Sequence, residues 1–492
     1  MNPLEVKNRK DLKNLIIYIE NNFKVNSWKI DDIHLWPILR IRLYMMVMME
    51  IENPTHLKIT ATPEPAKQKV KAARKRNLAT KIVERLKLEY QRLSLKYQKQ
   101  KDKRKLANWL KKLPKVDHLF FAQTTYRVTH KNKLFNRFFD TYIKQKNIGS
   151  NYMYLESKKD PNGDYLNKDQ ICFFEKFKKI YHHTTSIKNL EEHAEISLEG
   201  YKEFDLFIQQ FDYAKPFYKI FNKEDVLKIL AYIKKDLDFF NLILDQCKPT
   251  HVYSLCYYGG DVMCLMAEAN RKGVKTIDYQ HGPQTDVHMA YTSWSQLPED
   301  GYHMLPRNFW CWDPHSTEIV NQWANQHALY QAEEVGNFWI DYWKKKAKTF
   351  NENGFILYSL QPSPVKLSEL FTEEILQFIK HQDYTWYLRL HPRQLEQKED
   401  IIKLLESAGV YDLVEIDEAT NTPLPLLLSQ CQIHLTQYSG CAIEANLMGK
   451  NTVFLNTIGK EAFPYMFKER KAYYIDPESV DFNKKLTELL KV

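Results

Sequence analysis

The chain has 492 residues and a formal net charge of +10. Apolar residues make up 44% and aromatic residues 13%, which excludes an intrinsically disordered chain. Only 14 glycines occur, without a G-x-G-x-x-G or P-loop pattern, which excludes a glycine-rich phosphate loop. Because the length exceeds what one core ordinarily supports, we expect two or three domains.

The cysteines and the N-terminal residues indicate the cellular compartment in which the protein is expected. Seven cysteines are scattered without C-x-x-C or zinc-finger spacing, as is typical of reduced thiols. The most apolar early run, residues 35–49, contains Arg40 and Arg42 and is shorter than the ~20 residues of a membrane-spanning helix. No signal peptide is evident. We expect a cytoplasmic protein, either free or peripheral at the inner face of the cell membrane.

The N-terminal part is helical in pattern, and a basic segment follows it. Apolar spacing predicts helices in residues 1–65. Residues 66–112 hold 18 Lys or Arg against three acidic residues, with no Gly or Pro, which predicts a basic helix within 66–113. One stripe of this helix is apolar: Leu86, Tyr90, Leu93 and Tyr97. Contact with an anionic membrane and a solvated spacer are both open interpretations; without an accompanying motif, nucleic acid is not an expected partner.

Two sets of strands alternate with helices in the remaining chain. In the N-terminal Rossmann-like acceptor domain, 114–343, strands are predicted at 116–122, 151–155, 204–209, 252–258, 274–280, 309–312 and 332–335. In the C-terminal Rossmann-like nucleotide-donor domain, 344–476, they are predicted at 355–360, 385–390, 413–416, 433–436 and 452–455. The main helices are predicted at 224–247, 261–272, 315–326, 368–382, 396–408, 424–430 and 440–448, and a closing helix within 477–492. The predicted fold class is α/β, with two Rossmann-like domains facing a cleft, a helical N-terminal region and a long basic helix.

The strand 385–390 ends in basic residues, at the edge where parallel sheets bind ligands. Arg389 lies just before its end, His391 and Arg393 follow it, and Pro392 fixes the backbone between them. Guanidinium groups donate paired hydrogen bonds to phosphate, and imidazole is a donor of tunable charge. We expect these four residues to bind a donor phosphate, with an ordinary basic loop as the alternative.

The strand 433–436 ends at Thr436, and a helical pattern begins after Ser439 and Gly440. We expect these three residues to bind the donor. Ser is a favoured N-cap, and the amides of a helix start attract anions. Glu444, one turn further, is expected to accept hydrogen bonds from sugar hydroxyls of a nucleotide. The alternative is an ordinary cap in which Glu444 favours the helix dipole.

In the first domain, His281 follows the strand 274–280. A neutral imidazole facing a cleft is a natural general base, with a structural histidine as the alternative. Asp261, after the strand 252–258, is expected to orient His281, to contact the acceptor or to cap the next helix. Three neighbours of His281 are expected on the acceptor side: Gln280, Gly282, which permits close approach, and Gln284.

No metal site or cofactor is predicted. Asp236-Leu237-Asp238 matches the D-x-D of metal-dependent transferases, but it lies inside the helical pattern 224–247, where the two carboxylates diverge. His182-His183 lacks further metal ligands at a suitable spacing.

Together these segments resemble the two-domain glycosyltransferase architecture called GT-B. The likeness is to bacterial surface-polysaccharide enzymes: the Kdo and sialic acid transferases of capsule assembly and the CDP-glycerol glycerophosphotransferases. It covers residues 250–460 and rests on Gln280-His281-Gly282, Glu334-Val335-Gly336-Asn337, Arg389 to Arg393, and Ser439-Gly440 with Glu444. The resemblance implies that the His-Pro motif and the Ser-led helix bind the nucleotide phosphate, and that His281 is the acceptor base. Tyr438-Ser439 replaces the Ser pair usual in glycerophosphotransferases, and no D/E-D-G motif of the sialyltransferases occurs, which leaves the donor open.

The expected function is therefore metal-independent transfer of a sugar from a nucleotide-activated donor, with a CMP-linked sugar as one candidate. The expected acceptor is a growing cell-surface glycan on a lipid carrier. Three alternatives stay open: a CDP-glycerol or ribitol type of polyol-phosphate transferase, a non-catalytic scaffold for polysaccharide assembly, and a nucleotide-sugar epimerase of similar fold.

Overall fold

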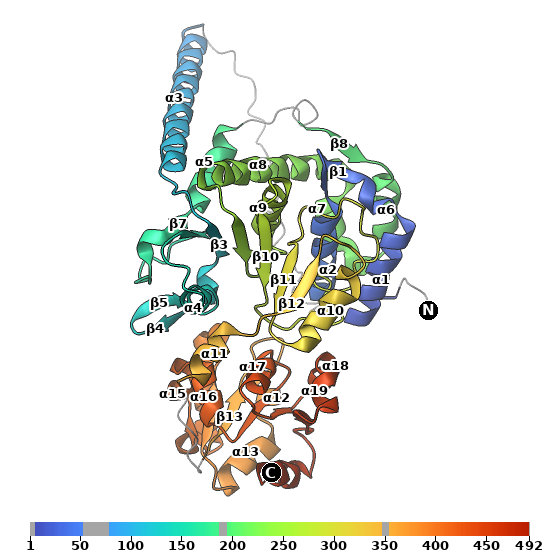
Figure 1. Cartoon of the computed structure of the whole chain (residues 1–492), viewed down its shortest axis with the longest axis vertical. Coiled ribbons are helices and arrows are strands. Elements are labelled where there is room, and N and C mark those ends of the chain that lie inside the picture. Colours follow the sequence, from blue (N-terminus) through green and yellow to red (C-terminus); the bar gives the residue numbers. More distant parts are fainter. Residues whose placement is uncertain (1–4, 53–77, 186–193, 347–353, 492) are drawn as a thin grey trace. The chain divides into compact units, whose positions relative to one another are not determined.

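The computed structural model describes residues 5–52, 78–185, 194–346 and 354–491, without the side chains of 52, 78–86 and 88. Its elements are shown in Figure 1. Residues 1–281, 286–310 and 317–333 form one compact unit, called unit 1, and residues 282–285, 311–316 and 334–492 form unit 2. The N-terminal helices and the basic helix are thus parts of unit 1. Residues 53–77, which include the start of the predicted basic segment, lie outside the described residues.

Unit 1 is built on a seven-stranded sheet in the order β12-β11-β10-β9-β3-β6-β7. Its strands are β3 (His118–Ala122), β6 (Tyr152–Glu156), β7 (Ile171–Phe173), β9 (His251–Ser254), β10 (Lys275–Tyr279), β11 (Asn308–Cys311) and β12 (Gln331–Glu334). The pairings from β7 to β11 are parallel. If the strands from β3 to β11 are numbered 1 to 6 along the chain, their order across the sheet is 3-2-1-4-5-6, which is the Rossmann order. β12 adds a seventh strand beside β11. The order reverses between β3 and β9.

Helices connect these strands, and two small sheets accompany them. The helices are α4 (Phe139–Gln145), α5 (Glu175–Thr184), α6 (Tyr201–Ile208), α7 (Lys215–Phe221), α8 (Lys223–Cys247), α9 (Gly260–Arg271) and α10 (Pro314–Ala324). β4 (Arg127–His130) and β5 (Lys133–Asn136) form a hairpin. β1 (Trp28–Ile30), β2 (Ile33–His34) and β8 (Ile196–Leu198) form an antiparallel sheet that the sequence did not predict.

The predicted strand 204–209 is wrong, because this segment lies in helix α6. Tyr201, Phe204 and Ile208 are buried and follow each other three and four residues apart, which is the spacing of one helix face. The Phe204 ring packs against Trp28, with centroids 4.9 Å apart. Burial against the N-terminal region therefore selects the helix.

Helix α3 (Leu78–Lys111) confirms the basic helix over its described residues. Its C-terminal part packs on unit 1, where Leu106 is buried and the Trp109 ring stacks on Phe177 of α5 with centroids 4.3 Å apart. Trp109 also stacks on Phe239 of α8 at 6.0 Å. Within the described part of the chain, no helix has both the length and the apolarity to cross a bilayer.

Unit 2 contains a six-stranded sheet in the order β15-β14-β13-β16-β17-β18. The strands, all paired in parallel, are β13 (Ile356–Ser359), β14 (Trp386–Arg389), β15 (Val414–Glu415), β16 (Ile433–Thr436), β17 (Thr452–Phe454) and β18 (Ala472–Tyr474). In chain order this is again 3-2-1-4-5-6, and the order reverses between β13 and β16. The fold-class prediction of an α/β protein with two Rossmann-like domains is confirmed.

Helices cover both faces of the unit 2 sheet. Ile356 and Tyr358 of β13 pack in one cluster with residues of α13 (Glu373–His381), α14 (Lys398–Ser407) and α20 (Phe482–Leu490). Leu357, on the opposite face, packs with residues of α16 (Leu424–Gln430) and α17 (Cys441–Leu447). Successive residues of β13 are thus buried on alternate faces, which accounts for the apolar run of residues 355–358. The predicted helix 368–382 is divided into α12 (Leu367–Leu370) and α13, because the Thr372 hydroxyl caps α13.

A buried ion pair joins helices α1 (Arg9–Asn22) and α2 (Trp36–Glu52) to the rest of unit 1. Arg40 and Glu20 approach within 2.8 Å, and the Arg40 guanidinium also donates to the carbonyl groups of Thr292 and Ser293 at 2.9 and 2.8 Å. The Glu20 carboxylate accepts from the Ser295 amide at 3.1 Å. The segment 292–295, which comes after His281 in the chain, is therefore held by charged groups of the N-terminal helices.

We expect Arg40→Leu to lower the free energy of unfolding by about 3–5 kcal/mol, because it leaves the Glu20 carboxylate buried without its partner. The double variant Arg40→Leu/Glu20→Leu should recover part of the loss. Urea unfolding measures both. Lys215→Ala, which removes an exposed ion pair with Asp212, is the control and should change stability by less than about 1 kcal/mol. Equal losses for Arg40→Leu and Lys215→Ala would contradict the interpretation.

Candidate functional site

In unit 1, the carboxyl ends of β9 and β10 are joined through the side chain of Asp278. This buried carboxyl group accepts from the Ser254 hydroxyl at 2.7 Å, the Tyr257 amide at 3.0 Å and the Tyr291 hydroxyl at 2.9 Å. Burial raises the pKa of Asp278 to about 7, although the three hydrogen bonds oppose that shift. Asp278 therefore fixes the end of β10, from which His281 follows.

His281 lies directly after β10 among aromatic side chains. Its Nε2 is 3.5 Å from the Tyr258 hydroxyl, and the Tyr126 ring meets its imidazole edge-on with centroids 5.6 Å apart. Its Nδ1 is buried and has no hydrogen-bond partner among the described residues. Burial, with smaller contributions from His288 and Arg137, lowers the pKa of His281 to about 3. The ring is therefore neutral at physiological pH, with an unpaired nitrogen that needs a partner.

Sequence reasoning missed Tyr126 and Tyr258, the two aromatic neighbours of His281. Tyr126 ends the 3-10 turn Thr124–Tyr126 after β3, and Tyr258 follows β9, so both come from the strands between which the order reverses. Their position after predicted strands was the available signal. Cys256, between β9 and Tyr258 in the chain, has φ 63°, and burial raises the pKa of its thiol to about 12, which keeps it protonated.

Asp261 does not contact His281, so the orienting role that the sequence allowed for it is not observed. It lies in the first turn of α9, where no side chain caps the helix, and its carboxylate pairs with Lys178 of α5. Lys178 also pairs with Asp236 at 2.9 Å. The hydroxyl of Tyr258, rather than Asp261, is the polar group observed beside the His281 ring.

The D-x-D sequence of α8 behaves as predicted for a helix interior. Asp236 contacts Lys178 and His182, while Asp238 pairs with Lys234 on its own helix at 3.0 Å. The two carboxylates therefore have different partners and share no site. Among the described residues, no group of three or more His, Cys, Asp or Glu side chains is arranged to hold a metal ion.

The neighbours of His281 differ in their surroundings. Gln280 is buried, and its amide donates to the Trp310 carbonyl at 2.9 Å. Gln284 is also buried, and its side-chain oxygen lies 3.4 Å from Cys311 Sγ. A Cβ added to Gly282 would meet no atom within 4 Å, so the described residues do not require a glycine there.

In unit 2, Gln361 connects the ends of three strands. It follows β13, its side-chain oxygen accepts from the Tyr438 amide at 2.6 Å, and its carbonyl accepts from the Gln394 side chain at 2.8 Å. Gln394 in turn accepts from the His391 amide at 3.1 Å. The two loops predicted to bind the donor are therefore held together by one residue that sequence reasoning missed.

His391 is oriented by its own turn. It caps the 3-10 helix Pro392–Gln397, and its Nδ1 accepts from the Arg393 amide at 3.1 Å. Burial, together with Arg393, lowers the pKa of His391, which favours the neutral ring. Because Nδ1 accepts, the proton of the neutral ring is on Nε2, which is then a donor. Pro392 and Arg393 are exposed.

Two of the residues predicted to bind the donor make internal hydrogen bonds. The Arg389 guanidinium donates to the carbonyl groups of Ala419 and Thr422, both at 2.5 Å. The buried Thr436 hydroxyl donates to the Ser359 carbonyl at 3.0 Å. These bonds join neighbouring segments of unit 2, so both side chains support the sheet edge.

The start of α17 is in close contact with the segment after His281. A Cβ added to Gly440 would lie 2.8 Å from Pro283 Cγ and Cδ, whereas the Ser439 hydroxyl accepts from the Cys441 amide at 3.3 Å. Glycine is therefore required for close approach at 440. Glu444 is 7% exposed and lies one turn into the helix, as predicted.

Comparison with solved structures gives distant likenesses. No protein-family model and no characterised protein sequence matches the chain. The chain is similar in structure to UDP-GlcNAc 2-epimerase from Methanocaldococcus jannaschii, with 10% identity, a TM-score of 0.41, and coverage of 76% of this chain and 92% of that one. For UDP-GlcNAc 2-epimerase from Neisseria meningitidis bound to UDP-GlcNAc, the values are 13%, 0.44, 77% and 91%. For MurG from Acinetobacter baumannii they are 13%, 0.37, 77% and 91%. Likenesses at this level assign neither an activity nor a ligand to the chain.

The raised pKa of Asp278 predicts a pH-dependent stability. Because the pKa rises from an ordinary 3.8 to about 7, the native state binds a proton that the unfolded chain releases between these values. Stability should therefore fall as the pH rises from about 4 to about 7, by up to ~1.4 kcal/mol per pH unit. Asp278→Asn cannot titrate, so its free energy of unfolding should fall less steeply. Urea unfolding at several pH values measures both slopes, and parallel profiles would contradict the assignment.

Proposed function

We propose that the protein is a metal-independent glycosyltransferase that moves a sugar from a nucleotide-activated donor to a growing cell-surface glycan. The donor binds to unit 2, and a CMP-linked sugar is one candidate. The acceptor binds to unit 1 on a lipid carrier, which brings the protein to the inner face of the cell membrane. The observation that carries the proposal is the Rossmann strand order in both units. In each unit the candidate residues follow either a strand at which that order reverses or the strand next to it.

The surroundings of His281 support its role as the base that receives the proton of the acceptor hydroxyl. The ring is neutral, and its Nδ1 is buried without a partner among the described residues. A pKa of about 3 makes it a weak base in the unliganded protein. A negatively charged group of a bound substrate would stabilise the imidazolium and raise the pKa. In this proposal, proton transfer is efficient only when such a charge is present.

The donor side is supported by His391, Arg393, Ser439 and Glu444. The Nε2–H group of His391 and the exposed guanidinium of Arg393 are donors suited to a phosphate. Their positive and dipolar character would stabilise the leaving nucleotide phosphate as the glycosidic bond to it breaks. Arg389 and Thr436 stabilise the loops through hydrogen bonds to backbone carbonyl groups.

We expect His281→Ala to lower kcat for sugar transfer by at least about 100-fold, because it removes the proton acceptor. The dissociation constant for the donor should change less than about 3-fold. His251→Ala is the matched control. His251 lies at the amino end of β9, away from the carboxyl ends of the strands, so this variant should leave kcat nearly unchanged. Near wild-type turnover of His281→Ala would defeat the assignment.

Removal of His391 should act on donor binding instead. We expect His391→Ala to weaken donor binding about 10-fold through loss of a hydrogen bond to phosphate, whereas His381→Ala, on the exposed end of α13, should not weaken it. Gln361→Ala should weaken binding about 3- to 10-fold, because the Tyr438 amide loses its acceptor. Calorimetric titration with the donor measures each effect.

A thermal-shift screen of CMP-, CDP-, UDP- and GDP-linked compounds selects the donor for these experiments. Stabilisation by a CDP-linked polyol alone would favour a glycerol- or ribitol-phosphate transferase. No stabilisation at millimolar concentrations would favour a non-catalytic scaffold. Conversion of the donor sugar without an acceptor would favour an epimerase.

A further inference from the structure

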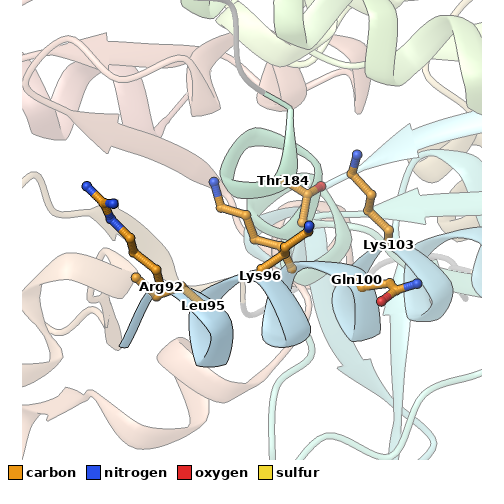
Figure 2. Close-up of a pocket in the computed structure, with 7 residues that line it drawn as sticks. Arg92, Leu95, Lys96, Gln100, Lys103 and Thr184 are labelled. Carbon is orange, nitrogen blue, oxygen red and sulfur yellow. The ribbon is translucent and has the colours of Figure 1, made fainter. Parts of the chain in front are cut away.

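Helices α3 and α5 of unit 1 form an open groove that is lined by basic side chains. The groove has a volume of about 550 Å³, and Thr184 is the residue of α5 that lines it. Figure 2 shows the side chains of α3 following one another along the helix beside Thr184. The α3 residues that line the groove are Arg92, Leu95, Lys96, Lys99, Gln100 and Lys103. The groove therefore has four basic residues and no acidic ones.

A second open groove, of about 710 Å³, lies further along the same pair of helices. It adds residues that are distant in the sequence from the basic segment. Its charged residues are Asp102, Lys105, Lys158, Lys159, Glu175, Lys176 and Lys179. Together the two grooves, called here the α3–α5 surface, have nine Lys or Arg residues against two carboxylates.

Most of this positive charge is not neutralised within the protein. Asp102 pairs with Lys105 at 3.2 Å, and Glu175 pairs with Lys179 at 2.7 Å and with Lys158 at 3.7 Å. Among the described residues, no carboxylate forms an ion pair with the other six basic side chains: Arg92, Lys96, Lys99, Lys103, Lys159 and Lys176. A surface of this kind attracts anions from outside the protein.

Helix α3 also exposes apolar side chains. Tyr90, Leu93 and Tyr97 have exposed fractions of 75%, 63% and 70%, and their spacing of three and four residues places them on one face of the helix. The groove side chains of α3 lie on a different face. Basic residues beside exposed aromatic and aliphatic ones are typical of helices that lie in a membrane interface. A nucleic acid would be attracted by the charge but would gain nothing from Leu93.

From these observations we propose that the α3–α5 surface docks on an anionic lipid bilayer. The basic side chains of both helices contact lipid phosphates, and Tyr90, Leu93 and Tyr97 enter the headgroup region. This contact does not depend on sugar transfer. It would bring unit 1 to the place where a lipid-linked acceptor resides.

The test is co-sedimentation of the full chain with vesicles of phosphatidylcholine, with and without about one third phosphatidylglycerol. We expect binding to the anionic vesicles only, and weaker binding as salt is added. The variant Lys96→Ala/Lys99→Ala/Lys103→Ala should bind at least about 10-fold more weakly at low salt. The variant Tyr90→Ser/Leu93→Ser/Tyr97→Ser should lose the binding that persists at high salt. All six side chains are exposed, so both variants should fold.

A matched control removes the same charge elsewhere. Lys380, Lys403 and Lys484 are exposed on unit 2, and their triple alanine variant should pellet as the wild type does. The proposal is overturned if the two lysine variants bind equally well. It is also overturned if the wild type does not bind the anionic vesicles, or if it binds a single-stranded oligonucleotide and not the vesicles. Donor binding, measured on the same variants, should be unchanged, so that failure of docking is distinguishable from failure of the sugar-transfer proposal.

Discussion

The buried carboxyl group of Asp278 is the interaction on which the unit 1 site depends. It holds the end of β10, the turn after β9 and Tyr291 together through three hydrogen bonds. His281 follows three residues later, so its position is set by a group that is itself fully enclosed. A buried carboxyl group with three partners tolerates little movement, because each lost bond leaves a polar atom without solvent or partner. The rigidity of the site therefore comes from the layer of residues behind it.

Unit 2 uses an amide for the same purpose. Gln361 joins the loop after β16 to the turn after β14, and it does so without a charge. Around it, Arg389 and Thr436 bind backbone carbonyl groups. The polar residues at this edge thus divide into those that hold the loops and those, such as His391 and Arg393, that can reach a ligand. Both kinds are polar and follow strands, so their positions in the sequence do not distinguish them.

Much of the fold was predictable from the sequence, and the site was predictable in part. The central strands are buried on two faces, which produces unbroken apolar runs such as residues 119–122 of β3, and these strands were found to within a few residues. The short strands β7 and β18 were not predicted. The segment 204–209 was misjudged because a short apolar run fits a strand and a helix equally well. The described residues require a small residue at Gly440, against Pro283, which the sequence did not indicate, whereas they do not themselves require one at Gly282.

The sequence by itself determined the alternation of strands and helices, the basic character of α3 and the residues that follow each strand, because these depend on local spacing and composition. The tertiary structure alone decided the partners of those residues. Asp261 pairs with Lys178 of α5, Tyr258 approaches His281, and lysines from two distant segments form one surface. Such pairings depend on which loops the strand order 3-2-1-4-5-6 brings to the same edge. Long-range packing sets that order, and no local pattern in the chain encodes it.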